Sequence, residues 1–346
     1  MMCPLFLNIC LLSGLLCVST TAQAQELPIR MLRHVAMYTD FEAILYGETI
    51  DTDPEALLSA GRSAFEAVDA LERRISNWKP DSYTSLANKK AADGPVQVSG
   101  DLIEILEEAR KVYADTGGAF DVTVGPLIQF WKERETLGIF PQPEDLKPVL
   151  ERIGLNHVFI DTKARTVYFE RQGMYLDFGG IAKGLALDRM AAILNENDVT
   201  TARLNAGTST IVAMGAPPGE DGWTVDILSP YNTAELTPIA TVKICDEALS
   251  TSADTVRHIC IGGKRYSHIY NPHTGMPASG IASATVIAPT GVESDALSTA
   301  FFVIGVDAAR AYCQVRPDVR AILVMDDKEK SGPIFINFTQ ENKKER

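Results

Sequence analysis

The chain has 346 residues, of which 46% are apolar, and its formal net charge is −13. This length suffices for one large domain or two modest ones, and the apolar content supplies a sizeable core. The acidic balance excludes broad nucleic-acid binding, which needs a basic surface, but it leaves room for one small anionic ligand in a local cationic pocket.

Residues 1–24 have the pattern of a secretory signal peptide. An apolar run too short for a comfortable membrane span ends in "AQA", a small-x-small cleavage signal. Cleavage after Ala24 would leave an exported, periplasmic or otherwise extracytoplasmic protein with a single domain over residues 25–346. No other segment is long and apolar enough to predict a membrane span. Lipid attachment through Cys17 is the alternative to simple export.

Three of the six cysteines would be lost with the signal peptide, which leaves Cys245, Cys260 and Cys313. An odd count without C-x-x-C spacing fits neither a disulfide framework nor a zinc site. We therefore expect buried free thiols, with one bridged pair as the alternative.

Helices dominate the first half of the chain and strands the second half. Apolar residues at helical spacing predict helices over residues 53–76, 101–115 and 143–154. Runs rich in Val, Ile and Thr predict strands over residues 157–161, 166–170, 202–207, 210–216, 223–228, 239–245, 282–289 and 320–325. This order predicts an α+β protein with a single mixed, mainly antiparallel β core and flanking helices.

The stretch "YLDFGGIAKGLALDRMAAILNEN", residues 175–197, runs from a short apolar segment through an acid and two glycines into an amphipathic helix. A helix N-terminus offers unpaired N–H groups and partial positive charge, which suit an anion. Gly179 and Gly180 permit close approach of the backbone, Lys183 adds a positive charge, and Asp177 can orient a ligand. The pattern matches neither a Walker loop nor a dinucleotide fingerprint. The alternative to an anion site is a purely structural turn, in which the glycines ease the passage from strand to helix and the lysine is solvated.

A second stretch, "APTGVESDALSTAFFVIG", predicts a helix start near Glu293, because Thr290 and Glu293 have capping-box spacing. Asp295 and Thr299 then share one helix face, with Ser298 beside them. One carboxylate with hydroxyl and carbonyl oxygens is a hard donor set that favours Mg²⁺ or Ca²⁺ over zinc. An ordinary helix start is the alternative.

Two further stretches carry candidate residues. In "KRYSHIYNPHTGMP", a strand enters a turn and His268 is placed to act as a base or ligand contact, although a lone histidine is more often structural. In "GGAFDVTVGPL", an aromatic residue beside an acid can hold a ring system, and a core Phe with a turn Asp is the plainer interpretation.

Together and in this order, the four stretches resemble the ApbE family of FAD:protein FMN transferases over residues 37–305. The resemblance implies a T-fold-like α+β architecture, a bound FAD and Mg²⁺. By position it implies flavin contacts at Met37, Trp78, Ala119, Phe120, Asp121, Asp177, Lys183 and Ile269. It implies Mg²⁺ on the Gly180 carbonyl, the Asp295 carboxylate, the Ser298 carbonyl and the Thr299 hydroxyl.

The activity that the resemblance implies is phosphoryl transfer. A Thr or Ser hydroxyl of a partner flavoprotein, typically a membrane-linked electron-transfer subunit, attacks the FMN phosphorus of FAD, and AMP leaves. Catalytic roles are expected for His268 as the base, Lys183 on the phosphate charge, and Asp295 on the metal. Two alternatives remain open: a FAD pyrophosphatase that uses water, and a non-catalytic flavin-binding protein.

The sequence departs from the family pattern at three places. Tyr38 replaces the glycine of M-G-T, Thr208-Ser209 replaces the second glycine and polar residue of N-A-G-G-D, and Ala253 replaces the glycine of T-S-G. An alanine at Ala253 is tolerated unless its φ is positive. These changes put the adenine side, partner docking, or both in question, and they leave the metal residues intact.

Overall fold

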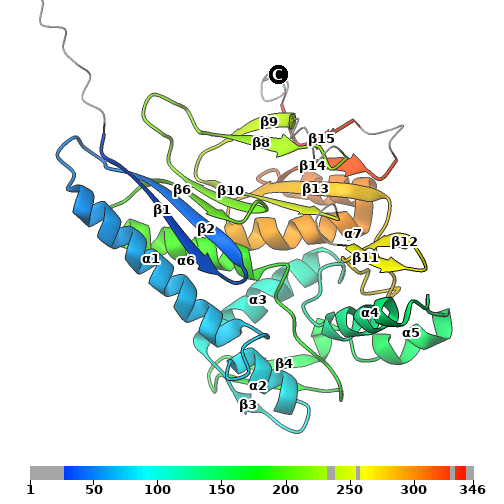
Figure 1. Ribbon diagram of the computed structural model, residues 1–346. Coiled ribbons are helices and arrows are strands. Elements are labelled where there is room, and N and C mark those ends of the chain that lie inside the picture. The colour runs from blue at the N-terminus through cyan, green and yellow to red at the C-terminus, as the bar shows by residue number, and fades with distance from the viewer. Residues whose placement is uncertain (1–26, 232–237, 255–257, 328–331, 340–346) are drawn as a thin grey trace, which may run out of the picture.

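The computed structural model describes residues 27–231, 238–254, 258–327 and 332–339 (Figure 1). The predicted signal peptide, its cleavage site and Cys17 lie outside these ranges.

An eight-stranded sheet in the order β1-β2-β6-β7-β10-β13-β14-β15 forms the centre of the fold. Its strands are β1 (Ile29–Ala36), β2 (Thr39–Tyr46), β6 (Thr201–Ala206), β7 (Thr210–Met214), β10 (Glu247–Ala253), β13 (Ile281–Ala288), β14 (Arg320–Met325) and β15 (Ile334–Ile336). Every neighbouring pair in this sheet is antiparallel. The predicted α+β class and mainly antiparallel core are therefore confirmed.

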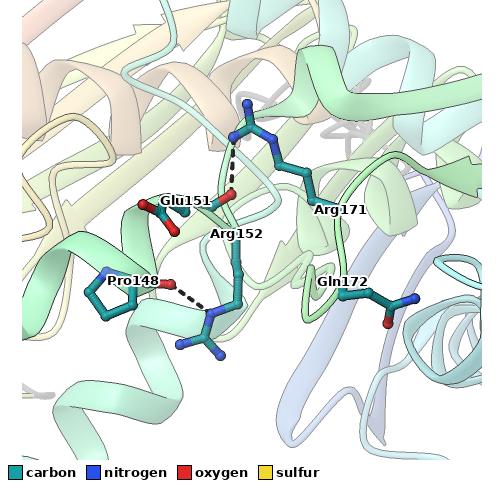
Figure 2. A pocket seen from close by; sticks show the side chains of 5 residues that line it. All are labelled: Pro148, Glu151, Arg152, Arg171 and Gln172. Atoms are coloured by element: carbon teal, nitrogen blue, oxygen red, sulfur yellow. Dashed lines mark hydrogen bonds between the residues drawn. The ribbon is translucent and has the colours of Figure 1, made fainter.

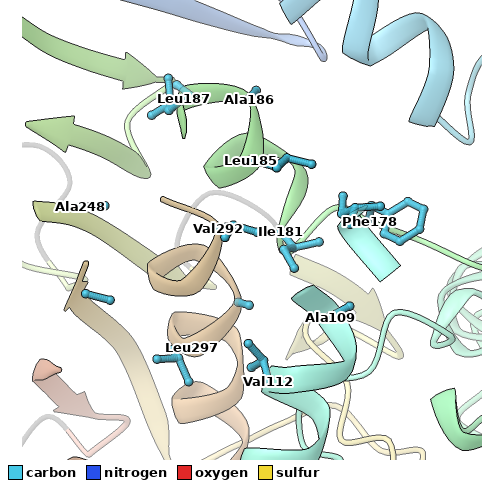
Figure 3. Close-up of a cluster of buried hydrophobic side chains, with 14 of the residues drawn as sticks. Ala109, Val112, Phe178, Ile181, Leu185, Ala186, Leu187, Ala248, Val292 and Leu297 are labelled. Carbon is cyan, nitrogen blue, oxygen red and sulfur yellow. The ribbon is translucent and has the colours of Figure 1, made fainter. Parts of the chain in front are cut away.

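Helices cover one face of the sheet. They are α1 (Pro54–Ile75), α6 (Ala182–Glu196) and α7 (Gly291–Val315), with α3 (Gly100–Asp115) packed behind α7 (Figure 1). Figure 3 shows the apolar interface of this layer, where Ile181 and Leu185 from the start of α6 meet Val292 and Leu297 of α7 and Val112 of α3. Helices α6 and α7, which carry Lys183 and Asp295, therefore belong to the main core.

Contrary to the expectation from the sequence, one segment after the predicted signal peptide, helix α7, is long and apolar enough, by length and composition, to cross a membrane, and within the described residues it alone passes that test. Half of its apolar window is buried inside the protein. Gly305, at φ 77° and ψ −174°, also interrupts the helix, so its two segments are each shorter than a span requires. These features fit a core helix.

The opposite face of the sheet is covered by the hairpin of β8 (Trp223–Leu228) and β9 (Pro238–Ile244). Alternate residues of β8, namely Trp223, Val225 and Ile227, point inward against Ile211 and Leu249 of the main sheet. A period of two residues places one side of a strand on the core, which is why this segment was predictable as a strand.

Two smaller units flank one end of the sheet. The first combines α2 (Tyr83–Lys90) with a small sheet of β3 (Val96–Gln97), β4 (Val158–Asp161) and β5 (Thr166–Phe169). The second packs α4 (Gly125–Leu137) and α5 (Pro143–Leu150) against the hairpin of β11 (His258–Ile261) and β12 (Lys264–Ser267) around buried Trp131. The Trp131 indole donates to the Gly275 carbonyl at 2.7 Å, which ties α4 to the turn after His268.

All three cysteines within the described residues are free thiols, as predicted, but the expectation that they are buried holds only for Cys313. Cys260 is exposed because it lies at an outward position of β11, between inward-facing Ile259 and Ile261. Cys245 is exposed at the turn after β9. The prediction was wrong for Cys260 and Cys245. The residue type alone does not determine whether a side chain points inward from a strand or lies at an exposed turn.

Candidate functional site

The segment before α6 is held in place by hydrogen bonds on both sides. The Asn88 side chain pairs with both backbone groups of Leu176, at 2.7 and 3.0 Å, and the Asp177 amide donates to the Val122 carbonyl at 2.7 Å. The Asp177 carboxylate accepts from the Asn77 side chain at 2.7 Å and from the Gly179 amide at 2.9 Å. Asp177 is therefore fixed at the turn into the helix, as the sequence predicted.

At the start of α6, the anion that the helix N-terminus binds is the Asp295 carboxylate of the same protein. The Gly184 amide donates to Oδ2 of Asp295 at 3.1 Å, and Lys183 Nζ lies 3.3 Å from both Asp295 oxygens. The carboxylate side chain is only 6% exposed. The first-turn amide and the lysine, which the sequence assigned to an external anion, thus hold Asp295 in this structure.

The N-terminus of α7 is fixed by α6. Both oxygens of Asp188 accept from α7 amides, Gly291 at 2.7 Å and Val292 at 2.8 Å. Burial raises the pKa of Asp188 to about 6, the two amide hydrogen bonds oppose this, and the nearby Asp295 charge adds to it. Asp188 therefore joins the helix that carries Lys183 to the helix that carries Asp295.

Glycines allow the two helices to touch at this point. A Cβ on Gly184 would lie 2.0 Å from the Gly291 carbonyl oxygen, and a Cβ on Gly291 would lie 2.6 Å from the Gly184 oxygen. The predicted cap of α7 is partly confirmed, since Thr290 accepts from the Glu293 amide at 3.3 Å. The reciprocal half of a capping box is replaced by an ion pair of Glu293 with Arg316 at 2.8 Å.

Hydroxyl groups surround Asp295. Thr210 donates to its Oδ1 at 3.5 Å, and the Ser252 hydroxyl lies 2.8 Å from that of Ser298 and 3.2 Å from that of Thr299. Gly180 adjoins the same group, because a Cβ there would lie 3.1 Å from Thr299 Oγ1. The structure thus brings together all four predicted metal residues, from the α6 turn and the first turns of α7.

These residues fit a hard cation by their donor chemistry. The donors are one carboxylate, one hydroxyl and backbone carbonyls, all of them oxygens. The Asp295 carboxylate supplies negative charge for a cation, and Lys183, which now balances that charge at 3.3 Å, would have to give up this contact when a cation binds. Across the residues that the structure describes, no group of three or more His, Cys, Asp and Glu side chains is placed to hold a metal.

The Ala119–Phe120–Asp121 segment is buried. Asp121 accepts from the Thr123 amide at 2.7 Å, the Thr123 hydroxyl at 2.6 Å and the Leu155 amide at 3.3 Å. Burial raises its pKa to about 6, against these hydrogen bonds. The Asp121 carboxylate therefore connects its own loop to the loop of Leu155. Phe120 lies beside the site, because its ring is 3.3 Å from the position that a Cβ on Gly180 would take. Flavin contact by these residues stays a prediction.

The remaining predicted site residues lie in loops outside α6 and α7. The β1–β2 turn holds Met37 and Tyr38, and the Gly207 amide donates to the Asp40 carbonyl at 2.7 Å, which joins this turn to the one before β7. Trp78 follows Asn77, the partner of Asp177. Ile269 packs against the main core, and His268 precedes it in the turn after β12. The structure places His268 in a separate segment from the Asp295 group, and its role as base stays a prediction.

The three departures from the family pattern have different structural consequences. Tyr38 has φ 59°, so a tyrosine adopts the left-handed conformation that suits glycine. Ala253 is paired with Ser283 within β10 and is absent from the residues at positive φ, so its Cβ is accommodated. Ser209 pairs its carbonyl with the Thr251 amide at 2.8 Å, which continues the contact between β7 and β10.

One surface hollow lies away from these residues. It has a volume of about 580 Å³ between the end of α5 and the turn after β5, and Pro148, Glu151, Arg152, Arg171 and Gln172 line it (Figure 2). Both arginine side chains are tied to backbone carbonyls, Arg152 to Pro148 at 2.9 Å and Arg171 to Glu151 at 3.0 Å. None of the predicted site residues borders it.

Sequence reasoning missed four residues that organise the site: Asn77, Asp188, Thr210 and Ser252. Asp188 carried a signal, because it lies in the same glycine-lysine stretch, four residues after Gly184 and hence on the same helix face as that glycine. The other three act through partners far away in the sequence, which no local pattern records.

Comparison with known proteins agrees with this arrangement. The model of the ApbE family matches residues 37–323. An FAD:protein FMN transferase of Treponema pallidum is 30% identical over 78% of each chain, and one of Haemophilus influenzae is 28% identical over 86% of this chain and 91% of its own. The crystal structure of the ApbE protein of Thermotoga maritima superposes with a TM-score of 0.78 at 26% identity, covering 92% of this chain and all of its own. With its fold, its four motifs and this match over most of its length, the chain belongs to the ApbE family.

Proposed function

We propose that this protein transfers FMN from FAD to a Thr or Ser hydroxyl of a partner flavoprotein and releases AMP, with Mg²⁺ as its metal. The observation that carries the proposal is the Asp295 carboxylate, which is nearly buried and is held by Lys183, the Gly184 amide and Thr210 where α6 meets α7. Family membership supports the reaction class, since curated relatives are named for it.

The residues that would hold Mg²⁺ are Gly180, Asp295, Ser298 and Thr299, through carbonyl, carboxylate and hydroxyl oxygens. When bound, the ion would supply positive charge to the pyrophosphate as negative charge develops on it.

The chain's own residues would perform the remaining work. Lys183 and the start of α6 would orient the diphosphate, and Asp177, fixed by Asn77, would hold the flavin side in register. The acceptor oxygen forms a bond to the FMN phosphorus, the bond from that phosphorus to the bridging oxygen breaks, and AMP leaves with the electron pair. His268 would take the proton from the acceptor hydroxyl.

We further propose that the protein works outside the cytoplasm after removal of residues 1–24, on a membrane-linked electron-transfer flavoprotein. The sequence pattern of this segment supports export. Expression of the full chain in a bacterial host, with mass spectrometry of the periplasmic protein, tests it: a mature N-terminus at Gln25 is expected, and an uncut chain in the cytoplasm would refute export.

The transfer reaction is tested directly by incubating the mature protein with FAD, Mg²⁺ and candidate exported flavoproteins. In-gel flavin fluorescence on the denatured acceptor, with one AMP per flavin attached and loss of both in EDTA, is the expected result. AMP without labelled acceptor would support hydrolysis by water instead, and bound FAD without AMP would support a flavin carrier. His268→Ala should slow transfer while FAD still binds, and unchanged turnover would remove this residue from the mechanism.

A further inference from the structure

Tyr38 is an exposed aromatic residue in a conformation that glycine would adopt more easily. Met37 and Tyr38 form the turn of the β1–β2 hairpin at φ 50° and 59°, and neither is glycine. Positive φ is unfavourable for residues with a Cβ. Tyr38 is 73% exposed, so burial of its ring does not offset that strain. A strained backbone conformation that persists near a functional site indicates that the side chain has a role there.

The Tyr38 ring is ordered against a second exposed aromatic residue. Its centroid lies 6.3 Å from that of Trp78, with the two rings inclined at 72°, an edge-to-face arrangement. Trp78 is 66% exposed. The pair thus presents two large apolar rings to solvent, although they come from segments 40 residues apart in the chain.

Each residue of this aromatic pair is linked, through neighbouring residues, to the group that contains Asp295 and Asp177. The turn that carries Tyr38 is joined to the β6–β7 turn, since the Gly207 amide donates to the Asp40 carbonyl, and β7 begins at Thr210, which contacts Asp295 at 3.5 Å. Trp78 follows Asn77, which donates to Asp177 at 2.7 Å. Under the proposed function, the acceptor protein brings its hydroxyl to a phosphate beside Asp295, and these links place the two exposed rings where its surface can contact them.

We propose that Tyr38, supported by Trp78, is a docking residue for the acceptor protein and contacts an apolar side chain flanking the acceptor Thr or Ser. The inference rests on the proposed function. Tyrosine and tryptophan are the residues that contribute most at protein interfaces, because they provide large contact area at small cost in side-chain entropy. A pair of rings already ordered against each other loses still less freedom on binding.

The experiment removes the ring without endangering the fold. Tyr38→Asn and Tyr38→Gly both suit positive φ, so the melting temperature should stay within about 3 °C of wild type or rise. Tyr38→Phe keeps the ring. Arg165→Gly is the matched control, because Arg165 is another non-glycine residue at positive φ, 52°, in the distant β4–β5 turn.

The probe is the acceptor protein that the wild-type enzyme labels in the gel assay above. For Tyr38→Asn and Tyr38→Gly, we expect the KM for this acceptor to rise about tenfold, with kcat, FAD affinity and acceptor-independent AMP release close to wild type. Tyr38→Phe and Arg165→Gly should match wild type.

The proposal is overturned if the acceptor KM is unchanged in both ring-deleting variants. It is overturned as well if FAD affinity falls while the acceptor KM holds, since Tyr38 would then be a cofactor contact. Absence of acceptor labelling by the wild-type enzyme would instead overturn the proposed function, so the two failures are distinguishable.

Discussion

The close contact between α6 and α7 predicts that replacing Gly184 by alanine lowers both stability and activity. In Gly184→Ala, the added Cβ would lie 2.0 Å from the Gly291 oxygen, 2.3 Å from its carbonyl carbon and 2.7 Å from the Val292 nitrogen. These are backbone atoms, so no side-chain rotation relieves the overlap. Restoring an ordinary contact of 3.4 Å to the oxygen requires the helices to separate by about 1.4 Å.

The cost of this separation can be estimated from the contacts that it disturbs. Overpacking of a tight core contact costs about 1–3 kcal/mol. The hydrogen bond from the Gly184 amide to the Asp295 carboxylate, at 3.1 Å, would lengthen or break, which adds about 1.5–3 kcal/mol for a bond to a charged group. We therefore expect the free energy of unfolding to fall by about 3–5 kcal/mol. A displacement of about 1 Å within a reaction site lowers the rate by about 10²-fold.

Urea unfolding followed by circular dichroism measures the first effect, and AMP release at saturating FAD measures the second. Gly100→Ala is the matched control, because a Cβ at this first position of α3 would meet nothing within 4 Å. The control should retain its activity and its free energy of unfolding within about 1 kcal/mol. A Gly184→Ala variant as stable and as active as that control would refute the idea that helix contact sets the geometry around Asp295.

Two other predictions follow from charged groups. Asp295→Ala should abolish turnover that depends on added Mg²⁺ while circular dichroism retains the native spectrum, and full activity of this variant would show that the metal assignment is wrong. Burial raises the pKa of Asp121 from 3.8 to about 6, so its contribution to the free energy of unfolding is fully present below pH ~4 and is lost as the pH rises through about 6. Denaturant unfolding at pH 4 and pH 7 should therefore show wild type losing up to about 3 kcal/mol relative to Asp121→Asn, and a difference that is constant with pH would contradict this.

Much of the fold was predictable because its strands and helices carry strong local patterns. The predicted helix over residues 53–76 is α1 (Pro54–Ile75), and the predicted strands over 223–228 and 320–325 coincide with β8 and β14. The helix predicted over 143–154 ends early, at Leu150, because the carbonyls of the last turn bond to Arg152 and Ile153 in tighter turns before Gly154. Local propensity thus placed these elements within a few residues.

Strand β10, "EALSTSA", shows why other elements escaped prediction. It lies in the middle of the main sheet, yet its small polar residues give no apolar alternation. Ser250 and Ser252 face α7 and lie 2.8 Å from the hydroxyls of Ser294 and Ser298. These paired hydroxyls satisfy one another inside the protein, so burial there is a property of the tertiary contact and leaves no signal in the strand itself.

The candidate site was predictable as a set of residues but not as an arrangement. The α7 pattern placed Asp295 and Thr299 on one helix face, and the glycine-lysine turn indicated a place for an external anion, which stays a prediction. The family resemblance already implied that Gly180 and Asp295 share one ion, but it did not indicate that the Asp295 carboxylate pairs directly with Lys183, at 3.3 Å. The residue pattern of neither motif records this contact, which is created by the packing of α6 on α7.

This contact bears on how a diphosphate can bind. Lys183 is already paired with Asp295, whose side chain is 6% exposed, so a diphosphate brought to the same helix start adds negative charge that this lysine does not balance. Like charges held close in a poorly solvated site repel strongly. Under the proposed function, Asp295 would hold a divalent cation whose positive charge offsets this repulsion, which would leave Lys183 to pair with the phosphate. The same argument makes FAD affinity itself, and not turnover alone, dependent on Mg²⁺, and it makes that dependence weaker when Asp295 is replaced by alanine.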